Sequence, residues 1–188
     1  MRPLEETALA FDRAARAAMV PYALVGGFAV SAWGQPRSTS DVDALVVLPD
    51  AKVESFAAAI RHEGLTVSMA DLRDVLRQGG HVTIFDPESS FHVDAKLCRT
   101  ASEREQVEQA AEVPFHGAKL RFARAEDTVA YKLLYGTPQD VNDAATILAR
   151  QAGKLDEGRL MSIALKLGVA PALRELEAKV QRGLKGER

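Results

Sequence analysis

The sequence predicts an α+β fold: a mixed sheet flanked by helices, with further helices at the C-terminal end. Up to about residue 122, short apolar or alternating segments typical of strands occur between amphipathic helical segments. Beyond that point the periodicity is helical only. The apolar fraction, 47% of 188 residues, supports a hydrophobic core. We therefore expect a core in residues 1–122 and a helical region in residues 123–188 packed on it.

The first part of the chain is read in order from its periodicity and its turn residues. Helical spacing over residues 4–19 ends before Pro21, and an apolar strand follows over 22–25. A short apolar helix is expected over 28–33 and a strand over 41–48. The later elements are a helix over 52–62, a strand over 65–69, a helical turn capped by Asp71 and ending at 78, strands over 81–86 and 91–97 forming a hairpin, a helix over 102–111 opened by a capping box, and a strand over 113–122 interrupted by Gly117.

The second part is expected to consist of helices. One helix begins at residues 125–128, where acidic residues suit the helix dipole, and a turn at 136–143 leads into another that ends near 150. Two more helices are expected over 157–167 and 171–180, with a frayed tail over 181–188.

Composition narrows the class of protein. The formal net charge of −2 gives no general basic field for nucleic acid, so any such contact needs a local patch. A single cysteine, Cys98, excludes an intramolecular disulfide and a cysteine-based zinc site. The N-terminus lacks the apolar core of a signal peptide, and no run of ~18 apolar residues is present. We expect a cytoplasmic protein without a membrane segment.

Two glycines end the apolar strand over 22–25. Gly26 and Gly27 allow a tight turn and a close backbone approach to a ligand. Free N–H groups at the start of the following helix suit a phosphate. A strand–helix turn without any ligand is the alternative for such a pair.

Two carboxylates follow at the start of the strand over 41–48. Asp41 and Asp43 share one face of that strand, with Cα atoms roughly 6.5–7 Å apart. Such neighbours repel each other unless a cation or water intervenes, and Mg²⁺ prefers oxygen ligands. The alternative is an exposed, solvated acidic strand end.

An acidic residue also lies within the alternating strand over 91–97. Asp94 shares a face with His92 and Lys96, opposite the apolar side chains. Because an unpaired buried charge is costly, Asp94 pairs with one of these two neighbours or joins Asp41 and Asp43 across the sheet.

The order of these features resembles the signature of the nucleotidyltransferase superfamily with a DNA polymerase β-type core. The matching features are Gly26-Gly27, then Arg37-Ser-Thr39-Ser40, then Asp41-Val-Asp43. The closer resemblance is to the AbiEii-like, toxin-type group, where an arginine and a hydroxyl residue precede the first aspartate. This resemblance implies that Asp94 is the third catalytic carboxylate.

The resemblance extends to about residue 150. In the toxin-type enzymes a helical lysine faces the nucleotide, and an aspartate from the next helix lies by the same cleft. The matching positions are Lys132 and either Asp140 or Asp143, although Gln139 replaces the basic residue often found there. The alternatives are a surface lysine with an extended side chain and ordinary acids at a helix start.

The resemblance implies a metal-dependent transfer of NMP from an NTP to a hydroxyl acceptor, with release of pyrophosphate. Asp41, Asp43 and Asp94 would hold Mg²⁺ or Mn²⁺, and Gly26, Gly27, Arg37, Thr39, Ser40, Lys132, Asp140 and Asp143 would bind the nucleotide. The acceptor would be tRNA, a protein or a small molecule, and the partners would be a second copy or a cognate toxin or antitoxin. One alternative is a nucleotide- or partner-binding protein without catalysis. The other is a glycosyltransferase, but the short chain and the position of the Gly-Gly pair argue against a glycosyltransferase.

Overall fold

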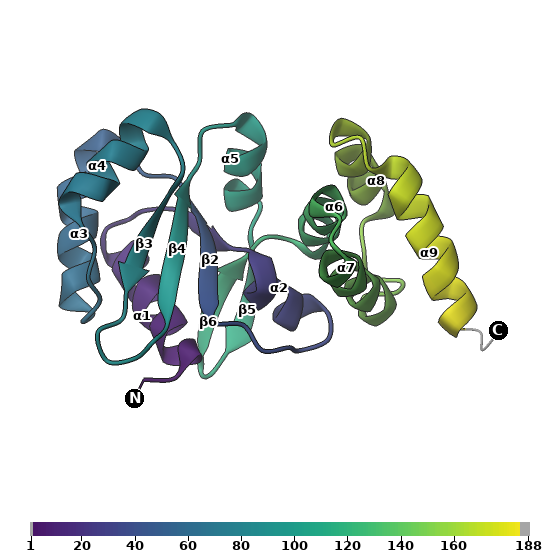
Figure 1. The fold of residues 1–188 in the computed structure, drawn as a ribbon, viewed down its shortest axis with the longest axis horizontal. Helices are drawn as coiled ribbons and strands as arrows, with labels where there is room; N and C mark the ends of the chain where they lie inside the picture. Colours follow the sequence, from purple (N-terminus) through teal and green to yellow (C-terminus); the bar gives the residue numbers. More distant parts are fainter. Residues whose placement is uncertain (1, 185–188) are drawn as a thin grey trace. The chain divides into compact units, whose positions relative to one another are not determined.

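The computed structural model describes residues 2–184, whose contacts divide into two compact units. The first unit holds the described residues up to Phe28 together with Ser38–Ala123, and the second holds Ala29–Arg37 and the described residues from 124 onward. The predicted α+β fold is confirmed, with a six-stranded mixed sheet among helices followed by C-terminal helices (Figure 1). The boundaries 1–122 and 123–188 stay a prediction about domains.

The sheet belongs to the first unit and has the strand order β3-β4-β2-β1-β6-β5. Two pairs of neighbours, β2 with β4 and β1 with β6, run parallel, and the other pairs run antiparallel. The strands are β1 (Tyr22–Leu24), β2 (Asp41–Val46), β3 (His81–Phe85), β4 (His92–Leu97), β5 (Ala111–Phe115) and β6 (Ala118–Phe122). The predicted β3–β4 hairpin is confirmed.

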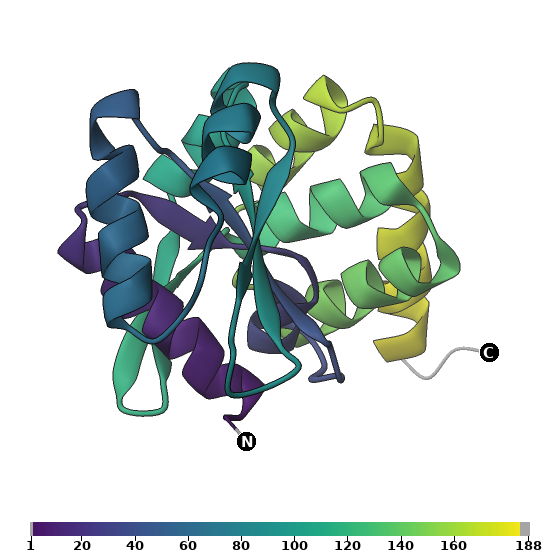
Figure 2. The ribbon, with the colours of Figure 1, turned by 60° about the vertical axis from the view of Figure 1, so that its left-hand side comes forward.

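One face of the sheet is covered by α1 (Leu4–Ala17) and α3 (Val53–His62), which contact each other (Figure 2). Phe11 of α1 packs edge-on against Tyr22 of β1, with ring centroids 5.3 Å apart, and against Phe56 of α3 at 6.4 Å. All three rings are almost completely buried, so this layer fixes one side of β1 and β2.

The opposite face is only partly covered by a helix of this unit. Val107 of α5 (Ala101–Glu108) packs with Ala23 and Leu45 in one buried cluster. Leu45 lies towards the carboxyl end of β2, whereas Asp41 and Asp43 at the amino end of the same face are only half-buried. Alternation along β2 therefore leaves the beginning of this face to polar side chains.

Helices make up the second unit, in which residues 29–37 join the C-terminal segment. The helices are α6 (Ala125–Tyr135), α7 (Pro138–Arg150), α8 (Glu157–Lys166) and α9 (Ala170–Leu184). Their buried core includes Val129, Ile147, Leu160 and Leu173, together with Val30 from the end of α2 (Gly26–Trp33). Gln151 donates a hydrogen bond to the Trp33 carbonyl at 2.7 Å, and Arg150 donates one to the Gly34 carbonyl at 3.1 Å.

The predictions for α2, for the strand over 65–69 and for the helix that follows it need correction. Helix α2 begins at Gly26 rather than Phe28, so both glycines lie in its first turn. The strand expected over 65–69 is only a single bridge between Thr66 and Phe85, and its last expected residue, Met69, is the first residue of α4 (Met69–Gln78). The α4 cap is Ser68, whose hydroxyl accepts from the Asp71 N–H.

Further corrections concern α5, the strand over 113–122 and the tail. The capping box joins Thr100 and Glu103, and α5 ends at Glu108, so Ala111 belongs to β5. The strand expected over 113–122 is a hairpin of β5 and β6, turned by two residues with positive φ, His116 and Gly117. Residues 181–184 are helical, and the rest of the tail predicted to be frayed, 185–188, lies outside the described residues. Within residues 2–184, no helix is long and apolar enough to cross a membrane.

Candidate active site

The two acidic segments singled out in the sequence meet in the centre of the sheet. Strands β2 and β4 pair in parallel, and their register places Asp43 opposite Asp94 and Asp41 opposite His92. Because Asp41 and Asp43 are two residues apart, as are His92 and Asp94, all four side chains lie on one face. The β2–β4 pairing therefore brings three carboxylates and one imidazole together within the first unit.

Two of these carboxylates each accept a hydrogen bond from a threonine hydroxyl. Thr39 donates to Asp41 Oδ1 at 2.8 Å, and Thr83 of β3 donates to Asp94 Oδ1 at 2.8 Å. Thr39 was predicted as a site residue, whereas Thr83 was not. The signal for Thr83 is a hydroxyl residue between the apolar Val82 and Ile84, and it gains meaning only once β3 pairs with β4 and places Thr83 opposite Asp94.

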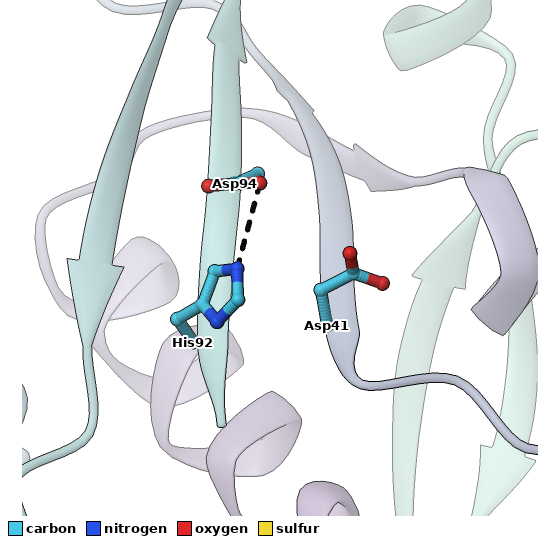
Figure 3. Close-up of side chains that lie close together, drawn as sticks. All are labelled: Asp41, His92 and Asp94. Carbon is cyan, nitrogen blue, oxygen red and sulfur yellow. Dashed lines mark ion pairs between the residues drawn. The ribbon is translucent and has the colours of Figure 1, made fainter. Parts of the chain in front are cut away.

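Asp41, His92 and Asp94 form a set that can hold a divalent cation (Figure 3). One ligand atom from each lies within 4.8 Å of the others, and all three side chains are half-buried. The His92 Nε2 lies 3.6 Å from Asp94 Oδ2. Asp94 therefore neighbours His92 and lies close to Asp41 across the β2–β4 pair, whereas Asp43 is related to Asp94 by the strand register. The amine of Lys96 lies 2.7 Å from the Glu103 carboxylate.

Gly26 has a specific steric requirement at this site. Its φ is +61°, and a Cβ on it would lie 1.9 Å from Asp43 Oδ2. The first turn of α2 can therefore approach the Asp43 carboxylate only because residue 26 has no side chain. This contact with Asp43 explains why residue 26 is glycine, whereas a close backbone approach to a ligand stays a prediction; Gly27 follows in the same helical turn. Ser40 is exposed at the bend that precedes β2.

The other predicted site residues form an ion-pair network in the second unit. Arg37 donates two hydrogen bonds to Asp143, from Nε to Oδ1 at 3.0 Å and from Nη2 to Oδ2 at 3.1 Å. Lys132 donates to Asp140 at 2.7 Å and lies 3.0 Å from Asp143 Oδ2. Gln139, which replaces the expected basic residue, donates to Asp143 at 2.8 Å.

Burial and hydrogen bonding act in opposite directions on the two aspartates of this network. Burial disfavours the charged form of Asp143, but hydrogen bonds from Arg37, Gln139 and Lys132 outweigh it and lower its pKa. Burial likewise opposes ionisation of Asp140, yet bonds from Lys132 and Thr137 hold its pKa below its ordinary value. Both carboxylates are therefore charged at neutral pH.

The network decides between the alternatives left open for its members. Lys132 is 8% exposed, so it is not an extended surface lysine. Asp140 is a helix-start acid, because it forms a capping box with Thr137, and it also binds Lys132. Asp143 is 2% exposed and is a buried partner of two cations. That these residues and Arg37 bind a nucleotide stays a prediction.

The fold is similar to solved structures of nucleotidyltransferases. The solution structure of the antibiotic-resistance factor ANT(2'')-Ia matches with a TM-score of 0.57 and 14% identity over 91% of this chain and 95% of that chain. The crystal structure of ANT(2'')-Ia in complex with adenylyl-2''-tobramycin gives 0.54 and 15% over 86% and 93%. An antigenic nucleotidyltransferase-like protein from Paracoccidioides brasiliensis gives 0.55 and 18% over 93% and 92%. No protein-family model and no curated protein matches the sequence.

These similarities, at identities of 14–18%, concern the fold. The chain shares the fold of these nucleotidyltransferases, so the resemblance inferred from its glycines and aspartates is confirmed at the level of the fold. The narrower resemblance to the AbiEii-like, toxin-type group stays a prediction.

Proposed function

We propose that this protein is a metal-dependent nucleotidyltransferase that moves an NMP from an NTP to a hydroxyl acceptor. The observation that carries the proposal is the parallel register of β2 and β4, which sets Asp43 opposite Asp94 on the face that also carries Asp41. The glycine start of α2, pressed against Asp43, supports it. Aspartates suit a cation, and the neighbouring backbone N–H groups at the glycine-containing start of α2 suit the phosphate chain bound to that cation.

In this mechanism Asp41, Asp43 and Asp94 would hold Mg²⁺ or Mn²⁺. When bound, the cation screens phosphate charge and lowers the pKa of the attacking hydroxyl. The N–H groups at the start of α2, after Gly26 and Gly27, orient the outer phosphates. Thr39 and Thr83 orient the carboxylates of Asp41 and Asp94 through their hydrogen bonds.

The transfer itself is a substitution at the α-phosphorus. The acceptor oxygen forms a bond to that phosphorus while the bond to the oxygen bridging to the β-phosphorus breaks, so pyrophosphate leaves. Asp94 takes the proton of the attacking hydroxyl, as a general base. We further propose that Arg37 and Lys132 contribute positive charge for the phosphates, with Asp140 and Asp143 fixing the two cations through the ion pairs described above.

The test uses each α-labelled NTP with Mg²⁺ or Mn²⁺ and three acceptor classes. Total cellular RNA and protein represent the acceptors implied by the toxin-type resemblance, and tobramycin represents the hydroxylated small molecule named with ANT(2'')-Ia. We expect label on one acceptor with the wild type and none with Asp41→Asn or Asp43→Asn. An exposed aspartate of α4, Asp71→Asn, is the matched control and should retain transfer.

Each outcome has a distinct meaning. Transfer that survives Asp41→Asn and Asp43→Asn would contradict the mechanism. NTP binding without transfer to any acceptor would favour the alternative, a nucleotide- or partner-binding protein on the same fold. A toxin role predicts growth arrest on expression that these two substitutions relieve and that co-expression of a cognate partner suppresses.

A further inference from the structure

We propose that His92 is a ligand of the same cation as Asp41 and Asp94, and that it makes the site select a transition dication such as Mn²⁺ over Mg²⁺. The proposal rests on the proposed function for the presence of a cation at these aspartates. It adds a nitrogen ligand to a site for which the sequence predicted oxygen ligands only.

The position of His92 follows from the register of the sheet. It begins β4, lies opposite Asp41 of β2, and is two residues from Asp94 on the same face. Its side chain is 30% exposed, and one of its ring nitrogens belongs to the group of ligand atoms that lie within 4.8 Å of one another (Figure 3). In the proposed site these three side chains would turn towards one ion, whose nitrogen and oxygen ligands lie at ~2.0–2.2 Å in zinc sites.

The neighbouring charges favour a cation at this point. Asp41 and Asp94 each accept a hydrogen bond at Oδ1 from a threonine hydroxyl. These bonds hold the two carboxylates in defined orientations. The second oxygen of Asp94 is the one that faces His92. Lys96, which shares this face of β4, forms an ion pair with Glu103 at 2.7 Å.

The chemistry of the donor set indicates which cation fits. Mg²⁺ is a hard ion that takes oxygen ligands and keeps several waters. Imidazole nitrogen suits first-row transition dications better than it suits Mg²⁺, and Mn²⁺ is the weakest binder of that series. Two carboxylates with one imidazole therefore form a mixed set that accepts Mn²⁺ through all three side chains but offers Mg²⁺ only the carboxylates.

The competing explanation is a His92 side chain that contacts only Asp94. In that case the imidazole would stay outside the coordination sphere, and its removal would change Mn²⁺ and Mg²⁺ binding in the same proportion. The two explanations differ in one direct observable, a nitrogen atom bonded to the ion.

The experiment measures Mn²⁺ bound to the full chain by electron paramagnetic resonance, without nucleotide. We expect ¹⁴N modulation of the bound-ion signal in the wild type and its loss in His92→Gln. The same substitution at His62, which is exposed at the end of α3, is the matched control and should leave the signal unchanged. Mn²⁺ affinity should fall at least about tenfold in His92→Gln, while Mg²⁺ affinity, measured by competition, changes little.

The proposal would be overturned by the absence of nitrogen modulation in the wild type, or by modulation that persists in His92→Gln. Equal losses of Mn²⁺ and Mg²⁺ affinity would do the same. Because the wild-type spectrum needs no variant, the test holds even if His92→Gln fails to fold, which its circular dichroism spectrum would show. Failure of the proposed function looks different: nitrogen-ligated Mn²⁺ would be present, but no NTP would transfer label in either metal.

Discussion

The Asp43 carboxylate occupies the space that a side chain on residue 26 would need. A Cβ on Gly26 would lie 1.9 Å from Asp43 Oδ2 and 2.7 Å from its Cγ. The start of α2 and the second aspartate of β2 are therefore positioned by one contact. A change at residue 26 must displace either the helix start or the carboxylate.

Gly26→Ala should cost more than backbone strain alone. A non-glycine residue at positive φ costs about 1–2 kcal/mol, and the displaced carboxylate adds to this. We expect a loss of at least about 3 kcal/mol in the free energy of unfolding, together with weaker metal binding, both measured on the purified variant. Gly64→Ala is the control, because φ there is +77° but the nearest atom to the new Cβ is 3.4 Å away. Equal losses for the two variants would contradict the steric role of Gly26.

Thr83 is expected to be a positioning residue for Asp94. Thr83→Val keeps the shape of the side chain but removes the hydroxyl that donates to Asp94 Oδ1. We expect kcat to fall about tenfold with KM for the NTP little changed, and Thr83→Ser to restore most of the rate. Steady-state kinetics provide the measurement. A change in KM alone, or no rescue by serine, would refute this role.

Asp143 should be the more important aspartate for the stability of the second unit. Asp143→Asn removes the buried carboxylate that Arg37 and Lys132 both contact, so we expect about 3 kcal/mol of destabilisation. Asp140→Asn should cost about 1 kcal/mol, because Lys132 keeps Asp143. Fluorescence of Trp33, the single tryptophan, reports urea unfolding of this unit directly. The reverse order of the two variants would contradict the network.

Glu103 should make the first unit sensitive to acid. Burial opposes its ionisation, but hydrogen bonds from Lys96 and the N–H groups of Thr100 and Arg99 lower its pKa from 4.5 to about 2. Because the folded pKa is depressed, this stabilisation is complete above about pH 4.5 and is lost as the pH falls towards 2. Glu103→Gln should therefore lose less stability than the wild type over that interval, measured by urea unfolding followed by circular dichroism. Parallel pH profiles would contradict it.

Local patterns predicted the elements of the site better than their assembly. Alternation placed Asp94 and His92 on one face of a strand, and Asp41 and Asp43 on one face of another. The hairpin between β3 and β4 followed from a short turn. The parallel pairing of β2 with β4 is non-local, and nothing in either strand's pattern specifies its neighbour or register.

Long-range side-chain contacts were harder still to predict. Arg37 and Asp143 are 106 residues apart, and their pairing depends on α7 and residues 29–37 sharing one unit. Capping also produced an error, because Thr100-Ala-Ser-Glu103 and Ser102-Glu-Arg-Glu105 both fit the same motif. The structure uses the first, where Glu103 also gains Lys96 as a partner.

The division of residues 29–37 from their neighbours in sequence has a consequence for biosynthesis. The last strand of the sheet ends at Phe122, yet Val30 and Trp33 belong to a hydrophobic cluster with α6 to α9, the first of which begins at Ala125. On the ribosome, this apolar stretch leaves the exit tunnel long before its packing partners are made. At roughly 5–20 residues per second, it waits several seconds in water, so chaperone binding to a nascent chain should be strongest there. A C-terminal truncation after the sheet would make that exposure permanent, and such a fragment should aggregate.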